Sequence, residues 1–252
     1  MDACPAATPA RLMATAVLGL CCAGAGADAM PIHHILPPAE LTPDGVPDLD
    51  FSRRTAQWAA QAGLELRWVS VPIKRSIEEL RRNHTAFCVL GLFDLPERRR
   101  FARYSLPISN GEAPVLLVAR RVAARMRLLP DARSALLDPR FEMLAFDGAA
   151  YGETLDRWAA ERQRPPLRVN AGTAQAVPML NRGRADFMIT VDAEWRQMLA
   201  KGGEDVAGLE VVRLPGMPEP PRRHLACSQR VPADWLARFN AAVRRNPPPP
   251  AQ

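Results

Sequence analysis

The sequence predicts an α/β fold made of two lobes, each with a mostly parallel sheet flanked by helices. Short β-like runs alternate with amphipathic helical segments from residue 31 to residue 244. One run, residues 87–93, is apolar on both faces, which is typical of a parallel strand covered by helices. The alternation restarts at residues 115–119, so the predicted elements exceed one small sheet. Two lobes joined by two crossing segments fit this pattern better.

The first half of the chain alternates strands and helices from residue 31. Asp48 or Asp50 can cap the first helix, and Gly63 supplies its C-terminal cap. The helix after Pro72 carries its apolar residues at the 3.6-residue period. The predicted strands are residues 31–36, 64–71 and 87–93. The predicted helices are residues 52–62, the segment that follows Pro72, and residues 96–102.

The second half of the chain repeats the alternation and ends in a proline run. The predicted strands are residues 115–119, 141–146, 167–170, 187–191, 209–214 and 225–228. The predicted helices are residues 132–137, 152–162, 173–182, 193–200 and 232–244. The last helix has Trp235, Phe239 and Val243 at helical spacing. Four prolines at residues 247–250 can form neither helix nor sheet, which predicts a disordered tail.

The first 29 residues have the pattern of a secretory signal peptide. Arg11 precedes an apolar stretch, and small residues follow up to Ala29 with an A-x-A cleavage site. The stretch is shorter than the roughly 20 apolar residues that a bilayer span needs. The sequence therefore predicts a periplasmic protein that is cleaved near Ala29. The alternative, a buried N-terminal helix, would be weakened by the glycines of this stretch.

The composition is that of an ordinary globular protein, with 48% hydrophobic and 24% charged residues. The net charge is +6, and nearly all of the positive charge is arginine. A basic surface can attract anionic ligands, an anionic membrane or nucleic acid. Because secretion argues against a nucleic-acid role, we expect no nucleic-acid partner. An arginine-rich, high-GC genome would also explain the charge.

Two cysteines, Cys88 and Cys227, remain in the predicted mature chain. In an oxidising compartment they can form one disulfide if their Cα atoms come within about 7 Å. Two separate buried thiols are the alternative. A zinc site formed by the two cysteines with His84 and His224 is a weaker alternative, because oxidised cysteines cannot bind a metal. We therefore expect no metal.

Sequence motifs of catalysis and cofactor binding are absent from the chain. It contains no G-x-S-x-G, no H-E-x-x-H, no P-loop and no G-x-G-x-x-G. We therefore expect neither an enzyme nor a cofactor.

Several short motifs follow one another along both predicted lobes. The first lobe contains GLFDLPER at residues 91–98, SLPI at residues 105–108 and VLLV at residues 115–118. The second contains YGETLD at residues 151–156 and LNRGRAD at residues 180–186. In order and spacing these motifs resemble those of bacterial extracellular solute-binding proteins of the polar amino-acid type, which have the type II periplasmic binding fold. The resemblance covers almost the whole predicted mature chain.

This resemblance implies recognition without reaction, in which two lobes close on a small ligand in the crevice between them. Arg98 stands at the position of the family arginine that binds the ligand carboxylate. A guanidinium can make two parallel charge-assisted hydrogen bonds to a carboxylate, which a lysine ammonium cannot. Arg75 starts a helix that the family turns toward the cleft, and it is a second candidate to hold an anion. Trp68 and Tyr151 are candidates to stack on the ligand, although packing within a lobe is an equal alternative for both.

Departures from the family pattern bear on the ligand. Phe93 and Leu95 stand where the family has two threonines, and Ile108 stands where it has a tyrosine. The acid nearest to the family position that holds the ligand ammonium is Asp192, about one residue away. Loss of these polar groups weakens binding of a free amino acid, because buried charges need partners. Phe93 and Asp192 remain candidate ligand-binding residues by their places in the pattern.

These observations predict a periplasmic solute-binding protein that captures a small polar or anionic, amino-acid-like metabolite for an ABC importer or a sensor. The alternative is a periplasmic interaction or scaffold protein with the same fold that has lost ligand binding. We expect a monomer whose first lobe comprises residues 30–112 and 215–252 and whose second lobe comprises residues 113–214.

Overall fold

The computed structural model describes residues 29–35, 41–170, 173–201, 204–219 and 221–250. The predicted signal peptide lies outside the described residues except for Ala29. Within these ranges no helix has both the length and the apolar character that crossing a bilayer requires.

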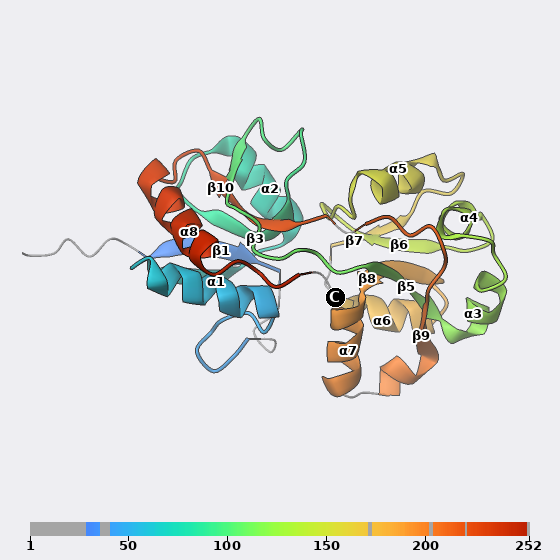
Figure 1. The fold of residues 1–252 in the computed structure, drawn as a ribbon. Coiled ribbons are helices and arrows are strands. Elements are labelled where there is room, and N and C mark those ends of the chain that lie inside the picture. Colours follow the sequence, from blue (N-terminus) through green and yellow to red (C-terminus); the bar gives the residue numbers. More distant parts are fainter. Residues whose placement is uncertain (1–28, 36–40, 171–172, 202–203, 220, 251–252) are drawn as a thin grey trace, which may run out of the picture.

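Two α/β lobes lie side by side, each built on a five-stranded sheet (Figure 1), which confirms the predicted two-lobed architecture. The first sheet has, in spatial order, β2 (Leu66–Ser70), β1 (Met30–His34), β3 (Cys88–Phe93), β10 (Arg223–Ser228) and β4 (Ala102–Tyr104). The second has β7 (Leu167–Val169), β6 (Met143–Phe146), β8 (Phe187–Val191), β5 (Pro114–Ala119) and β9 (Leu209–Val212).

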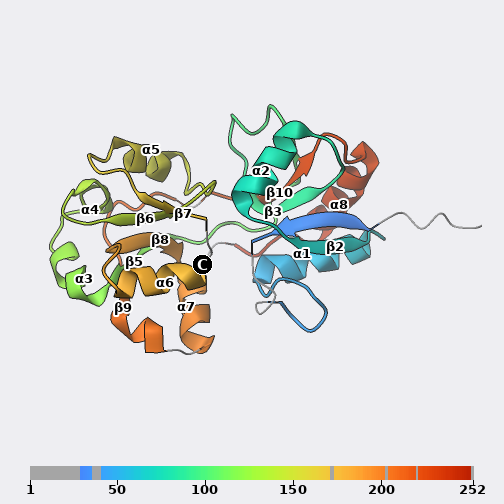
Figure 2. The ribbon, with the colours of Figure 1, turned by 180° about the vertical axis from the view of Figure 1, so that it is seen from behind.

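Helices cover both faces of each sheet. Figure 2 shows α1 and α2 on opposite sides of β1 and β2, and Figure 1 shows α5 and α6 on opposite sides of β6 and β8. The first lobe has α1 (Asp50–Gln61), α2 (Ile73–Arg82) and α8 (Ala233–Arg245). The second has α3 (Arg120–Met126), α4 (Ala132–Leu137), α5 (Glu153–Glu161), α6 (Thr173–Asn181), α7 (Asp192–Lys201) and the 3₁₀ helix η2 (Glu204–Gly208).

Both sheets are mixed but mostly parallel, as expected, because a single strand in each, β10 in the first and β5 in the second, runs against the other four. In the first sheet β1 pairs in parallel with β2 and β3, whereas β10 pairs antiparallel with β3 and β4. In the second sheet β6 pairs in parallel with β7 and β8, whereas β5 pairs antiparallel with β8 and β9.

The crossing segments explain the antiparallel pairings. The chain passes from β4 in the first sheet to β5 in the second, and from β9 back to β10. Strands β5 and β10 therefore begin at the junction of the lobes, whereas β1, β3, β6 and β8 end there, so the two groups run in opposite directions. The expected lobe limits, at residues 112/113 and 214/215, lie within the two crossing segments and remain a prediction.

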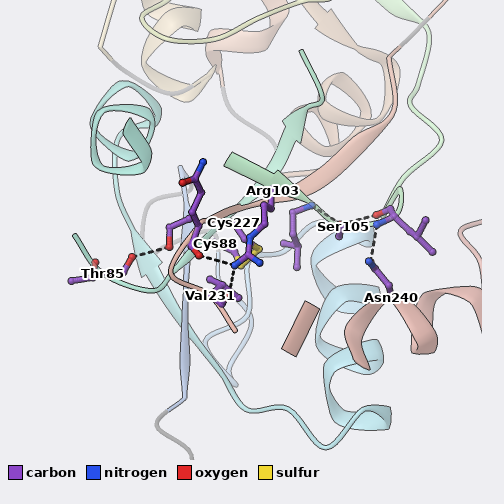
Figure 3. The surroundings of a disulfide bond; sticks show 11 residues. Thr85, Cys88, Arg103, Ser105, Cys227, Val231 and Asn240 are labelled. Carbon is purple, nitrogen blue, oxygen red and sulfur yellow. Dashed lines mark hydrogen bonds between the residues drawn. A yellow bond between two sulfur atoms is a disulfide. The ribbon is translucent and has the colours of Figure 1, made fainter. Parts of the chain in front are cut away.

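A disulfide joins Cys88 of β3 to Cys227 of β10, as predicted (Figure 3). The two residues are directly opposite in the ladder, their Cα atoms are 3.9 Å apart, and both side chains are fully buried. Because both sulfurs are bonded to each other, the zinc alternative for these cysteines is wrong. The disulfide ties together the two parts of the first lobe that the second lobe separates in sequence.

Side-chain hydrogen bonds around this disulfide join β10 and the turn that follows it to neighbouring segments (Figure 3). The Arg103 guanidinium donates to the carbonyl of Val231, and the Ser228 hydroxyl donates to the carbonyl of Thr85. The backbone amide of Leu225 donates to the Ser105 hydroxyl at 2.9 Å. These bonds satisfy polar groups that would be costly to bury without partners.

The proline run after α8 is placed against the first lobe, so the disorder predicted for residues 247–250 is wrong. The Asn110 side-chain amide donates to the carbonyls of Pro248 at 3.2 Å and Pro249 at 2.7 Å. The Trp58 indole N–H donates to the carbonyl of Asn246 at 2.8 Å. Proline lacks an N–H but keeps its carbonyl. The carbonyls of the tail can therefore accept hydrogen bonds although the tail forms neither a helix nor a sheet.

His33 of β1 is a buried histidine on the first lobe's α2 side. Its ring stacks on Phe87 with centroids 4.3 Å apart, and Nδ1 lies 3.1 Å from the Ser76 hydroxyl. Burial lowers the pKa of His33 below its usual 6.5, although Glu79 partly opposes this effect. The folded protein therefore favours the neutral ring.

We expect His33 to make the protein less stable in mild acid. Because the unfolded chain binds a proton that the folded chain excludes, the free energy of unfolding falls as the pH drops below about 6.5. This loss is at most about 1.4 kcal/mol per pH unit, the limit for one proton. In urea unfolding at pH 7.5 and pH 5.5, His33→Asn should lose less stability than the wild type. An equal loss in the two proteins would contradict this account.

Candidate functional site

A cavity of about 420 Å³ lies between the two lobes, within the size range of small-molecule sites. The first lobe contributes the ends of β1 and β3 and the start of β10. The second lobe contributes the ends of β6 and β8 and the start of β5. Both crossing segments also line the cavity, through Glu112 in one and Pro221 in the other. These strand ends and both connections thus present residues to the same space.

Arg98 is the most deeply buried charged group of this cavity. It follows β3 in a turn, its side chain lines the cavity, and the residue is 8% exposed. Its Nη2 donates to the carbonyl of Gly148 in the second lobe at 3.3 Å. Burial lowers the pKa of this guanidinium, while Glu97 and Asp156 act on it only at longer range. A buried cation held by a single carbonyl favours an anion beside it.

Arg223, the first residue of β10, is a second cation in the cavity wall. Its guanidinium carbon lies over the Phe93 ring, 5.2 Å from the centroid, and over the Phe51 ring, 5.6 Å from the centroid. Its Nη1 donates to the carbonyl of Gly91 at 3.4 Å. The aromatic contacts attract and position the cation without neutralising it.

Two glutamates also line the cavity, one from the first crossing segment and one from α7. One carboxylate oxygen of Glu112 accepts a hydrogen bond from the Ala193 amide at 3.0 Å. One carboxylate oxygen of Glu194 accepts from the Thr190 hydroxyl at 2.7 Å. These bonds fix both carboxylates at the second lobe's side of the cavity, where they can hold a cationic group such as an ammonium.

Tyr151 forms part of the cavity wall just before α5. Burial raises the pKa of its phenol to about 12, so the side chain is neutral at physiological pH. Its hydroxyl accepts a hydrogen bond from the Phe146 amide at 3.3 Å. The Asp156 carboxylate accepts from the backbone amides of Tyr151 and Gly152, which holds this loop in place.

Of the six predicted ligand-binding residues, three line the cavity: Arg98, Phe93 and Tyr151. Their placement is consistent with contact to a ligand, and the contact itself remains a prediction. Phe93 and Tyr151 come from different lobes, so the cavity has an aromatic wall on each side.

The other three predicted residues are absent from the lining of this cavity in the described part of the chain. The Arg75 side chain is 72% exposed and pairs with Glu79, one helical turn away on α2. Trp68 packs on the core of the first lobe, because alternate residues of β2 face that core. Asp192 pairs with Arg213 at the start of α7. Their own partners hold these side chains elsewhere, so of the six predicted residues Arg98, Phe93 and Tyr151 are the ones placed to contact a ligand in this cavity.

Sequence reasoning missed four charged residues of the cavity: Arg223, Glu112, Glu194 and Asp147. Two of them belong to the connections between the lobes, since Glu112 ends the first crossing segment and Arg223 begins the strand after the second. Crossing segments necessarily pass the junction of two lobes, and charged residues in them are a usable signal. Glu194 lies only two positions after Asp192, but a helix turns those two side chains in different directions.

Comparison with known proteins identifies the fold. No protein-family model and no curated protein matches the chain. Among solved structures, an ancestral arginine-binding protein bound to arginine is 15% identical with a TM-score of 0.65, over 86% of this chain and 91% of that one. Holo ArgBP from T. maritima is 19% identical with a TM-score of 0.64, over 86% of this chain and 89% of that one.

A third solved structure agrees with these two. It is an amino acid ABC transporter substrate-binding protein from Streptococcus pneumoniae bound to L-arginine, 16% identical with a TM-score of 0.64, over 86% of this chain and 87% of that one. The chain therefore has the type II periplasmic binding fold that the motif resemblance implied.

Proposed function

We propose that this chain is a periplasmic solute-binding protein. It captures a small polar or anionic, amino-acid-like metabolite in the cavity between its lobes and presents it to an ABC importer or a sensor in the membrane. Solved proteins of the same fold that bind arginine or serve amino acid ABC transporters support this proposal. The proposed role is reversible binding and not catalysis, and the proposed active form is the exported monomer.

The burial of Arg98 supports this proposal most strongly. The guanidinium lines the cavity, and within the described residues no carboxylate forms an ion pair with it. Desolvation of an arginine costs free energy that one long hydrogen bond to a carbonyl offsets only in part. A ligand carboxylate that accepts two N–H groups would offset the rest and would bind tightly for the same reason.

The lobes already touch at one point beside Arg98, which gives the ligand a closed form to stabilise. Lys74 of the first lobe pairs with Asp147 of the second at 3.4 Å, and Gly148 packs directly on the Lys74 backbone. A ligand that contacts both lobes binds this closed form better than an open one, so it shifts the population toward closure. Closure would then present a distinct surface to the membrane partner.

The alternative is a scaffold protein of the same fold that has lost its ligand. It is favoured by the apolar Phe93 and Leu95, which stand at the positions of two family threonines. Under this alternative the cavity would hold no metabolite, and Arg98 would serve only to join the lobes through Gly148.

A thermal-shift screen separates the two functions. The protein purified after export is screened against amino acids, organic acids and polyamines. A ligand present at 100 times its dissociation constant should add about 2.7 kcal/mol of apparent stability. Arg98→Ala should abolish the hit, whereas Arg99→Ala should keep it, since Arg99 is an exposed neighbour that pairs with Asp94. The absence of any hit, or a hit that survives Arg98→Ala, would contradict the proposed function.

A further inference from the structure

Arg223 is built into the cavity wall more rigidly than an ordinary surface arginine. Its backbone amide donates to the carbonyl of Ser109 at 3.1 Å, and its carbonyl accepts from the Ile108 amide at 2.8 Å. Both partners belong to the first crossing segment, so the residue is fixed between the two connections of the lobes. Its side chain then packs against the Phe51 and Phe93 rings.

Gly91 makes room for this arrangement. It has a φ of +76°, and a Cβ at this position would lie 3.1 Å from the Phe51 ring and 3.8 Å from Cδ of Arg223. The Phe51 ring and the aliphatic part of the Arg223 side chain therefore occupy the space into which a side chain at position 91 would project. The backbone of β3, the Phe51 ring of α1 and the start of β10 together hold one guanidinium at the cavity.

This guanidinium retains hydrogen-bonding capacity. A guanidinium has five N–H donors, and the hydrogen bond from Nη1 to the Gly91 carbonyl uses one of those of Arg223. The bond to the Gly91 carbonyl is long, at 3.4 Å, and no described carboxylate forms an ion pair with Arg223. Arg98 lines the same cavity and likewise forms no ion pair with a described carboxylate. The site therefore offers two cations that lack an anionic partner among the described residues.

We propose that Arg223 is a second anion-binding residue of the cavity and that the site selects small ligands with two carboxylates. This inference rests on the proposed function and specifies its ligand class. Arg98 would hold one carboxylate and Arg223 the other. The Glu112 and Glu194 carboxylates would accept an ammonium if the ligand carries one, as in an acidic amino acid. A ligand with a cationic side chain would meet the positive charge of Arg223 and would be rejected.

Calorimetric titration of the exported protein tests this selectivity with matched ligands. L-glutamate and L-aspartate carry two carboxylates and an ammonium, and glutarate and succinate carry two carboxylates alone. L-glutamine replaces the second carboxylate of glutamate with a neutral amide of the same shape, and L-arginine replaces it with a cation. At least one of the four dicarboxylates should bind roughly tenfold or more tightly than L-glutamine, because a hydrogen bond between charged groups is stronger than one to a neutral group.

Variants assign that preference to Arg223. Arg223→Gln should reduce the affinity for the dicarboxylate about tenfold or more, while the affinity for L-glutamine changes little. Arg222→Gln is the control, because Arg222 is exposed and does not line this cavity. Thermal unfolding of each ligand-free variant checks that it is folded. If Arg223→Gln does not fold, the preference of the wild type for glutamate over glutamine remains the test.

The outcomes separate this inference from the proposed function. Tight binding of L-glutamine or L-arginine that depends on Arg98, with no preference for dicarboxylates, would overturn the role of Arg223 and leave solute binding standing. A preference for dicarboxylates that persists in Arg223→Gln would also overturn it. Failure of every compound to bind would contradict both proposals.

Discussion

Removal of the Cys88–Cys227 disulfide is expected to lower the free energy of unfolding by about 5 kcal/mol on the chain-entropy model. The two cysteines are 139 residues apart, and the loop that they close contains the whole second sheet. A free unfolded chain gains far more conformations than one crosslinked across such a loop. A loss of this size is comparable to the entire stability of many domains, about 5–15 kcal/mol.

The measurement is urea unfolding of the double variant Cys88→Ala/Cys227→Ala beside the wild type. Alanine is the appropriate replacement, because both side chains are fully buried and serine would bury an unsatisfied hydroxyl. The wild type in a reducing agent should show a similar loss without any change in sequence. Equal unfolding midpoints of oxidised and reduced wild type would show that the disulfide contributes nothing to stability.

Gly148→Ala is expected to weaken ligand binding about 5- to 150-fold, which corresponds to the 1–3 kcal/mol cost of overpacking. A Cβ at position 148 would lie 2.9 Å from Cα and 3.0 Å from the backbone nitrogen of Lys74. These are backbone atoms of the opposite lobe, so they can give way only if the lobes separate. Under the proposed function the ligand binds the closed form, and the clash would arise in that form alone.

A matched control isolates the closure effect. Gly148 has a φ of +78°, so alanine there is also strained in the backbone of both open and closed forms. Gly45 has a φ of +74°, but a Cβ there would meet no atom of the described residues within 4 Å. Gly45→Ala should therefore lose stability without losing ligand affinity. Titration calorimetry of both variants is decisive, and equal affinities in Gly148→Ala and the wild type would mean that closure does not use this contact.

Most of the fold was predictable because regular elements follow periodic apolar patterns. The 3.6-residue period located α2 at Ile73–Arg82, and the fully apolar run located β3 at Cys88–Phe93. The helix expected at residues 96–102 is instead a turn followed by β4, whose pairing with β10 comes from a distant part of the chain. The short α3 was missed because its seven residues carry too few turns for a periodic signal.

The cavity was less predictable than the fold. Arg98 and Phe93 belong to a contiguous motif, so their sequence order alone placed them near each other. Arg223 reaches the same cavity only because β10 pairs with β3 in a register that sets it opposite Phe93. Asp192 was a reasonable candidate by position, but Arg213 lies within reach of its carboxylate and pairs with it. Register and competition for partners are properties of the folded chain, which local sequence does not contain.

A crystal structure of the exported protein grown with its tightest ligand tests the central claim most directly. The account predicts the ligand between the lobes, with one of its acidic oxygens about 2.7–2.9 Å from the Arg98 guanidinium, the length of a charge-assisted hydrogen bond. A ligand bound outside this cavity, or bound inside it with Arg98 still joined only to the Gly148 carbonyl, would contradict the account.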